Sequence, residues 1–150
     1  MNAYSNLLSF GACGSGHVPY CYGFIDRLDP SLFSPHLDHF AGDEFHPQAI
    51  VLDLLADPEP LNCVNYSIDR FVGVLRGIRE IHRARILHYD IYPKNILIVP
   101  GEPERVLWID FDVAKTFSAT ENLDSKTKEL FADEEILAAS LGDLLVCLLS

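Results

Sequence analysis

Positive charge is scarce in this chain of 150 residues, which has 11 Lys and Arg against 22 Asp and Glu and a formal net charge of −11. Such a surface repels polyanions, so we expect neither nucleic acid nor an anionic membrane as a partner. Lysine is rarer still, and the first of only four lysines stands at position 94. Chemistry that needs a lysine is therefore confined to the later part of the chain.

Signals for secretion, membrane insertion and cysteine chemistry are also missing. The N-terminus shows no basic segment followed by an apolar run, so we expect an intracellular, cytoplasmic protein. The apolar run at 144–149 is too short and too close to Asp143 to span a bilayer, which favours a core position. The four cysteines lack Cys-x-x-Cys spacing, so the sequence supports neither a zinc site nor a disulfide.

Residues 29–47 form a polar stretch longer than a compact hairpin normally tolerates, and we expect an exposed insertion there. Three histidines and three nearby acids in it could bind a metal. No tight spacing supports such a site, so a polar surface loop explains the composition better. These residues are His36, Asp38, His39, Asp43, Glu44 and His46.

Apolar periodicity predicts a mixed α+β fold. We expect helices at 2–10 and 133–149, the second opened by an acidic first turn, and strands at 21–28 and 49–55. The Pro-Glu-Pro sequence at 58–60 breaks the chain before a further helix. That helix has apolar side chains at three- and four-residue steps, which predicts one buried face, with arginines on the solvated side. Its apolar positions are Val64, Ile68, Phe71, Val72, Leu75, Ile78 and Ile81.

Two aliphatic runs, 96–99 and 106–109, flank the turn sequence 100–104 and predict a β-hairpin. Antiparallel pairing places Asn95, just before the first strand, and Asp110, just after the second, at the same end. An amide oxygen and a carboxylate are hard ligands that suit Mg²⁺. We therefore expect a shared cation site at this end of the hairpin.

The segment 88–95 reads His-Tyr-Asp-Ile-Tyr-Pro-Lys-Asn, and the hairpin that follows it ends in Asp110-Phe111. This compound pattern has a low false-positive rate. It supplies Asp90, a carboxylate that can accept a hydroxyl proton, next to two metal ligands. The combination points to phosphoryl transfer.

On these residues, 18–115 resembles a divergent, fungal-type protein-kinase-like domain, with aminoglycoside-type phosphotransferases as more distant relatives. The resemblance implies that His88, Asp90 and Asn95 are catalytic-loop residues, with His88 bracing the metal-binding loop. It implies Mg²⁺ held by Asn95 and Asp110, and ATP as the phosphate donor. The acceptor would be a hydroxyl of a protein or a small molecule.

Within this resemblance the chain is one incomplete kinase-like domain. A remnant of the small-lobe sheet with the hinge would occupy about 1–58, and the first part of the helical large lobe about 59–150. The second strand ends at the hinge that binds adenine, which implies Leu54 as a nucleotide contact. No Gly-x-Gly-x-x-Gly motif occurs, and the glycines at 11–16 fit a flexible turn better than a phosphate-binding loop.

The motif also departs from the usual kinase pattern. Tyr89 replaces an arginine, Asp112 a glycine and Tyr92 a lysine, while Lys94 stands two positions after Tyr92. Two functions therefore stay open. The chain is either a phosphotransferase by ancestry, impaired in this form, or a catalytically silent module that binds a nucleotide or a protein partner. The missing phosphate-binding elements favour the silent module, since phosphoryl transfer depends on positioning.

Overall fold

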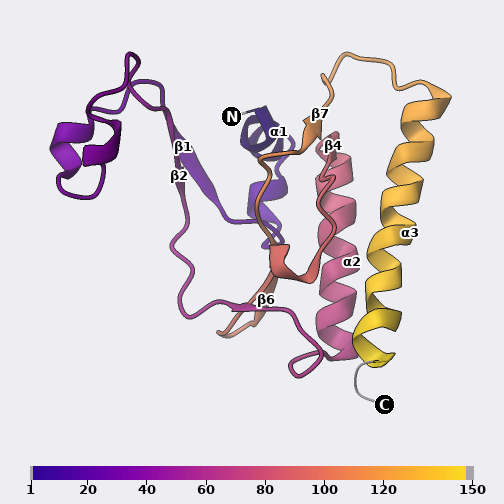
Figure 1. Ribbon diagram of the computed structural model, residues 1–150. Helices are drawn as coiled ribbons and strands as arrows, with labels where there is room; N and C mark the ends of the chain where they lie inside the picture. Colours follow the sequence, from indigo (N-terminus) through magenta and orange to yellow (C-terminus); the bar gives the residue numbers. More distant parts are fainter. Residues whose placement is uncertain (1, 148–150) are drawn as a thin grey trace.

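The computed structural model describes residues 2–147, which form three α-helices, short 3-10 turns and paired strands (Figure 1). The chain opens with helix α1 (Asn2–Ser9), as predicted, and the glycine cluster then forms a tight turn around Ala12–Gly14. Gly11 and Gly16 have φ values of 78° and 80°, a left-handed conformation that glycine adopts readily. Because a helix precedes this cluster, it is not a glycine-rich loop between two strands.

Strand β1 (Cys21–Ile25) pairs antiparallel with β2 (Ala49–Leu52), so both predicted strands are present but shorter than expected. The ladder stops where the chain leaves for an excursion at 26–48. A hydrogen bond from Leu28 N to Pro47 O, 2.9 Å long, closes the base of this excursion. It contains 3-10 turns and projects away from the rest of the molecule at the left of Figure 1. The expectation of an exposed insertion is confirmed.

The predicted hairpin is confirmed to within one residue, as strands β5 (Ile96–Val99) and β6 (Arg105–Trp108). The Pro-Glu-Pro sequence does more than break the chain, because β3 (Glu59–Pro60) pairs with the other edge of β5. Proline is tolerated there since β3 is an edge strand. A further pair, β4 (Ile86–Leu87) with β7 (Lys115–Thr116), is too short for a sequence pattern to predict.

Helix α2 (Ile68–Arg83) begins later than the apolar pattern suggests. The side-chain oxygen of Asn62 accepts the N–H of Val64 at 2.8 Å, and this turn competes with helix formation. Val64 is 87% exposed, Ile68 66% and Val72 37%, so the predicted buried face is wrong at these positions. The helix starts instead after Ser67, which caps it. Its buried residues are Phe71, Val74, Gly77, Ile78 and Ile81.

Helix α3 (Ser125–Cys147) begins earlier than the predicted residue 133. The reason is that Asp124 caps the helix: its side chain accepts the N–H of Thr127 at 2.7 Å. The acidic cluster at 133–135 suggests a later start. The helix lies alongside α2 (Figure 1), and Arg79 of α2 pairs with Glu135 at 3.2 Å. At least part of the arginine face of α2 is therefore engaged by α3 as well as by solvent.

Several large apolar side chains of α3 are open to solvent. Ile136 is 68% exposed, Leu137 52% and Leu144 60%. Residues 148–150, the end of the predicted helix, lie outside the described residues. Among residues 2–147, no helix combines the length and the apolar character needed to cross a membrane.

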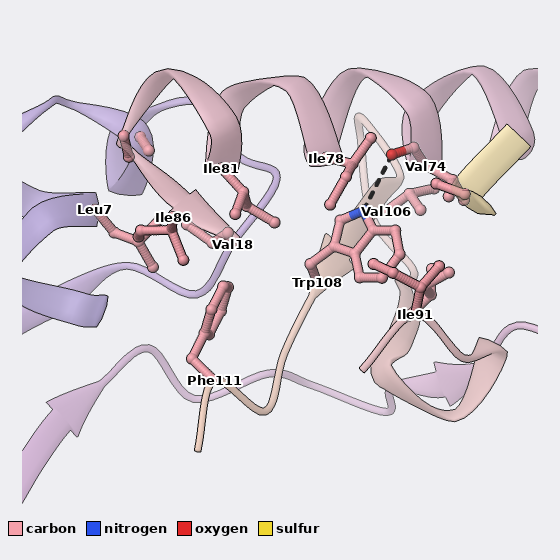
Figure 2. Packing of buried hydrophobic residues seen from close by; sticks show 14 of the residues in the cluster. Leu7, Val18, Val74, Ile78, Ile81, Ile86, Ile91, Val106, Trp108 and Phe111 are labelled. Carbon is pink, nitrogen blue, oxygen red and sulfur yellow. Dashed lines mark hydrogen bonds between the residues drawn. The ribbon is translucent and has the colours of Figure 1, made fainter. Parts of the chain in front are cut away.

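The core forms where α2 packs against the β5–β6 hairpin, and Trp108 lies at its centre (Figure 2). The Trp108 side chain is fully buried, and its indole N–H donates to Val74 O at 3.0 Å. Gly77 faces the ring, and a Cβ at this position would lie 2.6 Å from Trp108 Cδ1. The helix can therefore approach the hairpin this closely only with glycine at position 77. This packing fixes the hairpin whose ends carry the polar residues of the motif.

Candidate active site

Asn95 is the buried centre of the polar cluster, with only 2% of its surface exposed. It lies in the 3-10 turn Pro93–Asn95, immediately before β5. Its side-chain amide donates to the backbone oxygen of Asp90 at 2.9 Å and to Asp90 Oδ2 at 2.7 Å. Both amide protons are thus committed to Asp90. The Oδ1 atom of Asn95 is therefore the atom available to a cation.

Asp110 follows β6 at the same end of the hairpin. The pairing continues one step beyond the strands, because the N–H of Ile109 donates to Asn95 O at 2.9 Å. Asp110 is exposed and has a φ of 65°, a left-handed conformation that Asp tolerates better than most residues. The backbone of Asp110 is thus placed next to that of Asn95, as the hairpin register predicts. Two hard oxygen ligands at this site fit Mg²⁺, which keeps several waters and takes further ligands from phosphates.

His88 connects the two halves of the cluster. Its side chain is fully buried, and Nε2 lies 2.9 Å from Ile109 O while Nδ1 lies 3.3 Å from the N–H of Asp90. A carbonyl can only accept and a backbone N–H can only donate, so the imidazole is neutral with its proton on Nε2. Burial lowers the pKa of His88, which favours the same neutral form. His88 thus braces the residue before Asp110 against the catalytic loop.

Asp90 is surrounded by donors. Besides the Asn95 amide, the Lys94 ammonium lies 3.1 Å from Asp90 Oδ2. Two contacts lower the pKa of the Asp90 carboxyl. The hydrogen bond from Asn95 has the larger effect and the contact with Lys94 the smaller one. Asp90 is therefore ionised at neutral pH, as a group that accepts a proton must be.

Glu134 is the residue of this polar cluster that sequence reasoning missed. It comes from α3, is only 7% exposed, and its Oε2 accepts from His82 Nε2 at 2.7 Å and from His88 N at 3.0 Å. Its Oε1 accepts from Tyr89 N at 2.7 Å. Burial alone would raise the pKa of Glu134, but these hydrogen bonds outweigh it and the pKa is lowered. In the sequence, Glu134 is visible only as one acid of the run 133–135, and that run is typical of the first turn of a helix.

Tyr89 explains why such an anchor is needed. This residue has a φ of 62°, a conformation that costs a side chain with a Cβ about 1 kcal/mol or more. The charge-assisted bond from its N–H to Glu134 holds the backbone in that conformation. Helix α3 thus sets the shape of the loop that presents Asp90.

Phe111 packs the second half of the motif against the body of the protein. Its ring lies 4.9 Å from that of His88 and 5.4 Å from that of Tyr4 on α1. Burial raises the pKa of Tyr4 to about 12, so this ring is a neutral packing partner. The contacts join α1, the catalytic loop and the residue that follows Asp110.

Two other predicted sites lie apart from this cluster. Leu54 is 92% exposed on the connection after β2, and no hydrogen bond among residues 2–147 joins it to the loop at 88–95. In the excursion, His46 contacts Leu28 O at 3.1 Å, but no three His, Cys, Asp or Glu side chains of the described chain gather as a metal-binding group. The structure thus brings together His88, Asp90, Asn95 and Asp110, and leaves Leu54 outside.

Residues 70–130, which span α2, the catalytic loop, the hairpin and the start of α3, match the lipopolysaccharide kinase (Kdo/WaaP) family. Serine/threonine-protein kinase pkn3 of Myxococcus xanthus is 30% identical over 111 residues, covering 72% of this chain and 19% of that protein. Myosin light chain kinase family member 4 of Homo sapiens is 37% identical over 65 residues, 43% of this chain and 16% of the relative. The chain thus spans about a fifth or less of the length of these two relatives.

A solved structure described as WaaP in complex with acyl carrier protein aligns with 90% of this chain and 64% of its own, at 18% identity and a TM-score of 0.48. These relatives come from a bacterium and a mammal, so the fungal affinity expected from the sequence gains no support from them. The structure has the predicted α+β class. The sequence matches support a protein-kinase-like domain.

Proposed function

We propose that this chain, which shares a protein-kinase-like domain with its relatives, takes part in ATP-dependent phosphoryl transfer to a hydroxyl acceptor. In this proposal Asn95 and Asp110 hold Mg²⁺ and Asp90 accepts the acceptor proton. The observation that carries it is the commitment of both Asn95 amide protons to Asp90. That single arrangement orients the proposed base and leaves Asn95 Oδ1 for the proposed cation.

The proposed step follows from the chemistry of these groups. Asp90 orients the acceptor hydroxyl, whose oxygen forms a bond to the terminal phosphorus of ATP. The bond from that phosphorus to the bridging oxygen breaks, ADP leaves with the electron pair, and the hydroxyl proton passes to Asp90. When bound, Mg²⁺ would neutralise charge on the phosphoryl oxygens. His88 and Glu134 position the loop and do not touch the reacting atoms.

The nucleotide base would lie against the connection after β2, where the exposed side chain of Leu54 is available for apolar contact. The acceptor is a protein or a small molecule, and its identity is a separate question from the chemistry at Asp90. A catalytically silent module that binds nucleotide or protein is the second candidate. One observation favours it, because Asp90 Oδ2 is already held by both Lys94 and Asn95.

Calorimetric titration of the purified chain with Mg²⁺-ATP tests the metal site. Asp110→Asn removes a charged ligand at an exposed position, and we expect a loss of affinity of about tenfold or more. Asp43→Asn makes the same change in the excursion and serves as the matched control. Equal binding by the wild type and Asp110→Asn would exclude the proposed metal site.

A turnover assay separates the two candidate functions. With [γ-³²P]ATP and a generic protein acceptor, transfer that disappears in Asp90→Asn supports the enzyme. Nucleotide binding without Asp90-dependent transfer supports the silent module.

A further inference from the structure

A cavity of about 700 Å³ lies at the turn end of the β5–β6 hairpin, opposite the end that carries Asn95 and Asp110. Its walls come from three separate parts of the chain, which are the turn at 15–17, the first half of α2 with its cap, and residues 103–106. The volume is typical of pockets that bind small molecules. No residue of the loop at 88–95 lines the cavity, so it is distinct from the candidate active site.

Hydrogen bonds fix the three walls to one another. Arg70 of α2 donates through Nε and Nη2 to the two carboxylate oxygens of Glu104, at 2.8 and 2.7 Å, which joins the helix to the hairpin. The N–H of Trp108 donates to His17 O at 2.8 Å, and His17 Nδ1 lies 3.3 Å from Val106 O, which joins the turn to the hairpin. A bidentate guanidinium–carboxylate pair has a defined geometry. The cavity is therefore pre-formed, and a ligand does not have to order its walls.

Two further arginines of the lining have hydrogen-bond donors that are not used within the protein. Arg76 of α2 is exposed, and among residues 2–147 no hydrogen bond or ion pair joins it to another side chain or to the backbone. Arg105 of the hairpin uses Nη1 to contact Asp53 at 3.2 Å. A guanidinium has more N–H donors than this one contact occupies. Two cations from different walls can therefore donate to a ligand in the cavity.

The charge of the lining differs from that of the chain as a whole. Three of the seven arginines in the sequence line this one cavity, although the chain carries a net charge of −11. The acids of the lining are Asp69 and Glu104, and Glu104 is already paired with Arg70. Arg76 thus remains without a paired acid. The cavity is the place where this acidic protein can accept an anion.

We infer that this cavity binds a small molecule with a phosphate group, which accepts hydrogen bonds from Arg76 and Arg105. The oxygens of a phosphate point in several directions, so they can accept from guanidinium groups on two walls at once. A carboxylate is matched by the fork of a single guanidinium. The inference goes beyond the proposed function, because this site needs neither Mg²⁺ nor any residue of the loop at 88–95.

The test is titration of the full chain with phenyl phosphate in the presence of EDTA, followed by amide NMR spectra. We expect the backbone signals of Gly16, Gly73 and Val106, which line the cavity, to shift. Inorganic phosphate should shift the same signals, which separates recognition of the phosphate group from contacts with the rest of the molecule. Benzoate has the same ring with a carboxylate in place of the phosphate, and it should bind at least about tenfold more weakly.

Substitutions of the two arginines test their role directly. Arg76→Met should weaken the binding of phenyl phosphate about tenfold to hundredfold, because charge-assisted hydrogen bonds are lost, and Arg105→Met should do the same. Arg79→Met is the matched control, since Arg79 lies on the same helix but pairs with Glu135 and does not line the cavity. Its affinity should equal that of the wild type. Circular dichroism checks the fold, which Arg76→Met should keep because Arg76 is exposed and unpaired within the described chain.

Several outcomes would overturn the inference. Absence of binding at millimolar phenyl phosphate would do so, as would equal affinities of the wild type and Arg76→Met or of phenyl phosphate and benzoate. An equal loss in Arg79→Met would show a general effect of charge. Shifts confined to 88–95 and Asp110 would place the phosphate in the candidate active site instead. Tighter binding of an aspartate-rich peptide than of phenyl phosphate would identify a docking surface for an acidic protein segment.

Discussion

The anchoring of the catalytic loop by Glu134 can be tested with two substitutions of different severity. Glu134→Ala removes the acceptor of three hydrogen bonds at a site that is 7% exposed. Removing one partner of a buried polar cluster typically costs about 3–5 kcal/mol of unfolding free energy. We expect a loss in this range for Glu134→Ala, since two backbone N–H groups lose their partner.

Glu134→Gln keeps the shape but cannot keep all the bonds. Its amide has one acceptor oxygen, whereas His88 N and Tyr89 N donate to different oxygens of the native carboxylate. In either orientation the amide NH₂ therefore faces a backbone N–H. One unsatisfied buried donor costs about 1–3 kcal/mol, which is the loss we expect.

Urea unfolding followed by the fluorescence of Trp108, the single tryptophan of the chain, measures these losses. Glu135→Gln is the matched control, because Glu135 is the adjacent residue and makes an exposed pair with Arg79 that is worth about 0–1 kcal/mol. If Glu134→Gln costs no more than Glu135→Gln, the anchoring argument is refuted.

The pH dependence gives an independent check on the same carboxylate. The pKa of Glu134 is lowered in the folded state, so its contribution is complete above the unfolded value of 4.5 and is lost as pH falls through the folded value. The difference in stability between the wild type and Glu134→Gln should therefore shrink as the pH is lowered below 4.5. A difference that grew toward acid pH would contradict the assigned sign.

Two further predictions concern the core and the buried histidine. Gly77→Ala adds a methyl group 2.6 Å from a ring atom of Trp108, and we expect it to lose about 1–3 kcal/mol in urea unfolding despite the better helix propensity of alanine. Gly14→Ala, where nothing lies within 4 Å of the new methyl group, should be near neutral, and equal losses would contradict the packing argument. Burial lowers the pKa of His88, so the unfolded state takes up its proton first and stability falls as pH drops below 6.5. His88→Asn should show a smaller loss of stability between about pH 7.5 and pH 5.5 than the wild type, and an unchanged slope would contradict a neutral His88.

The sequence predicts the local parts of this site well. The β5–β6 hairpin is correct to within one residue because both strands and their turn are adjacent in the chain. Its register alone brings Asn95 and Asp110 to the same end. Patterns fail where a side chain acts on backbone atoms, as when Asn62 delays the start of α2 or Asp124 advances that of α3.

Long-range polar contacts were beyond the reach of any local pattern. Glu134 looks like an acid in the first turn of a helix until the earlier start of α3 moves it to an inner face. No residue near Tyr89 in the sequence indicates that the N–H of Tyr89 donates to a distant carboxylate. The contact depends on how α3 packs beside α2, which is decided by side chains distributed along both helices.

The bond between Glu134 and the catalytic loop also sets an order of events during synthesis. Glu134 follows Tyr89 by 45 positions, so at about 5–20 residues per second it is added to the chain about two to nine seconds after it. The hairpin can pair in that interval, since it needs only its own residues. Until Glu134 is added, the backbone N–H groups of His88 and Tyr89 lack the acceptor that they have in the folded structure. On a translating ribosome the end of the hairpin that carries Asn95 and Asp110 can therefore form seconds before Asp90 acquires its final position.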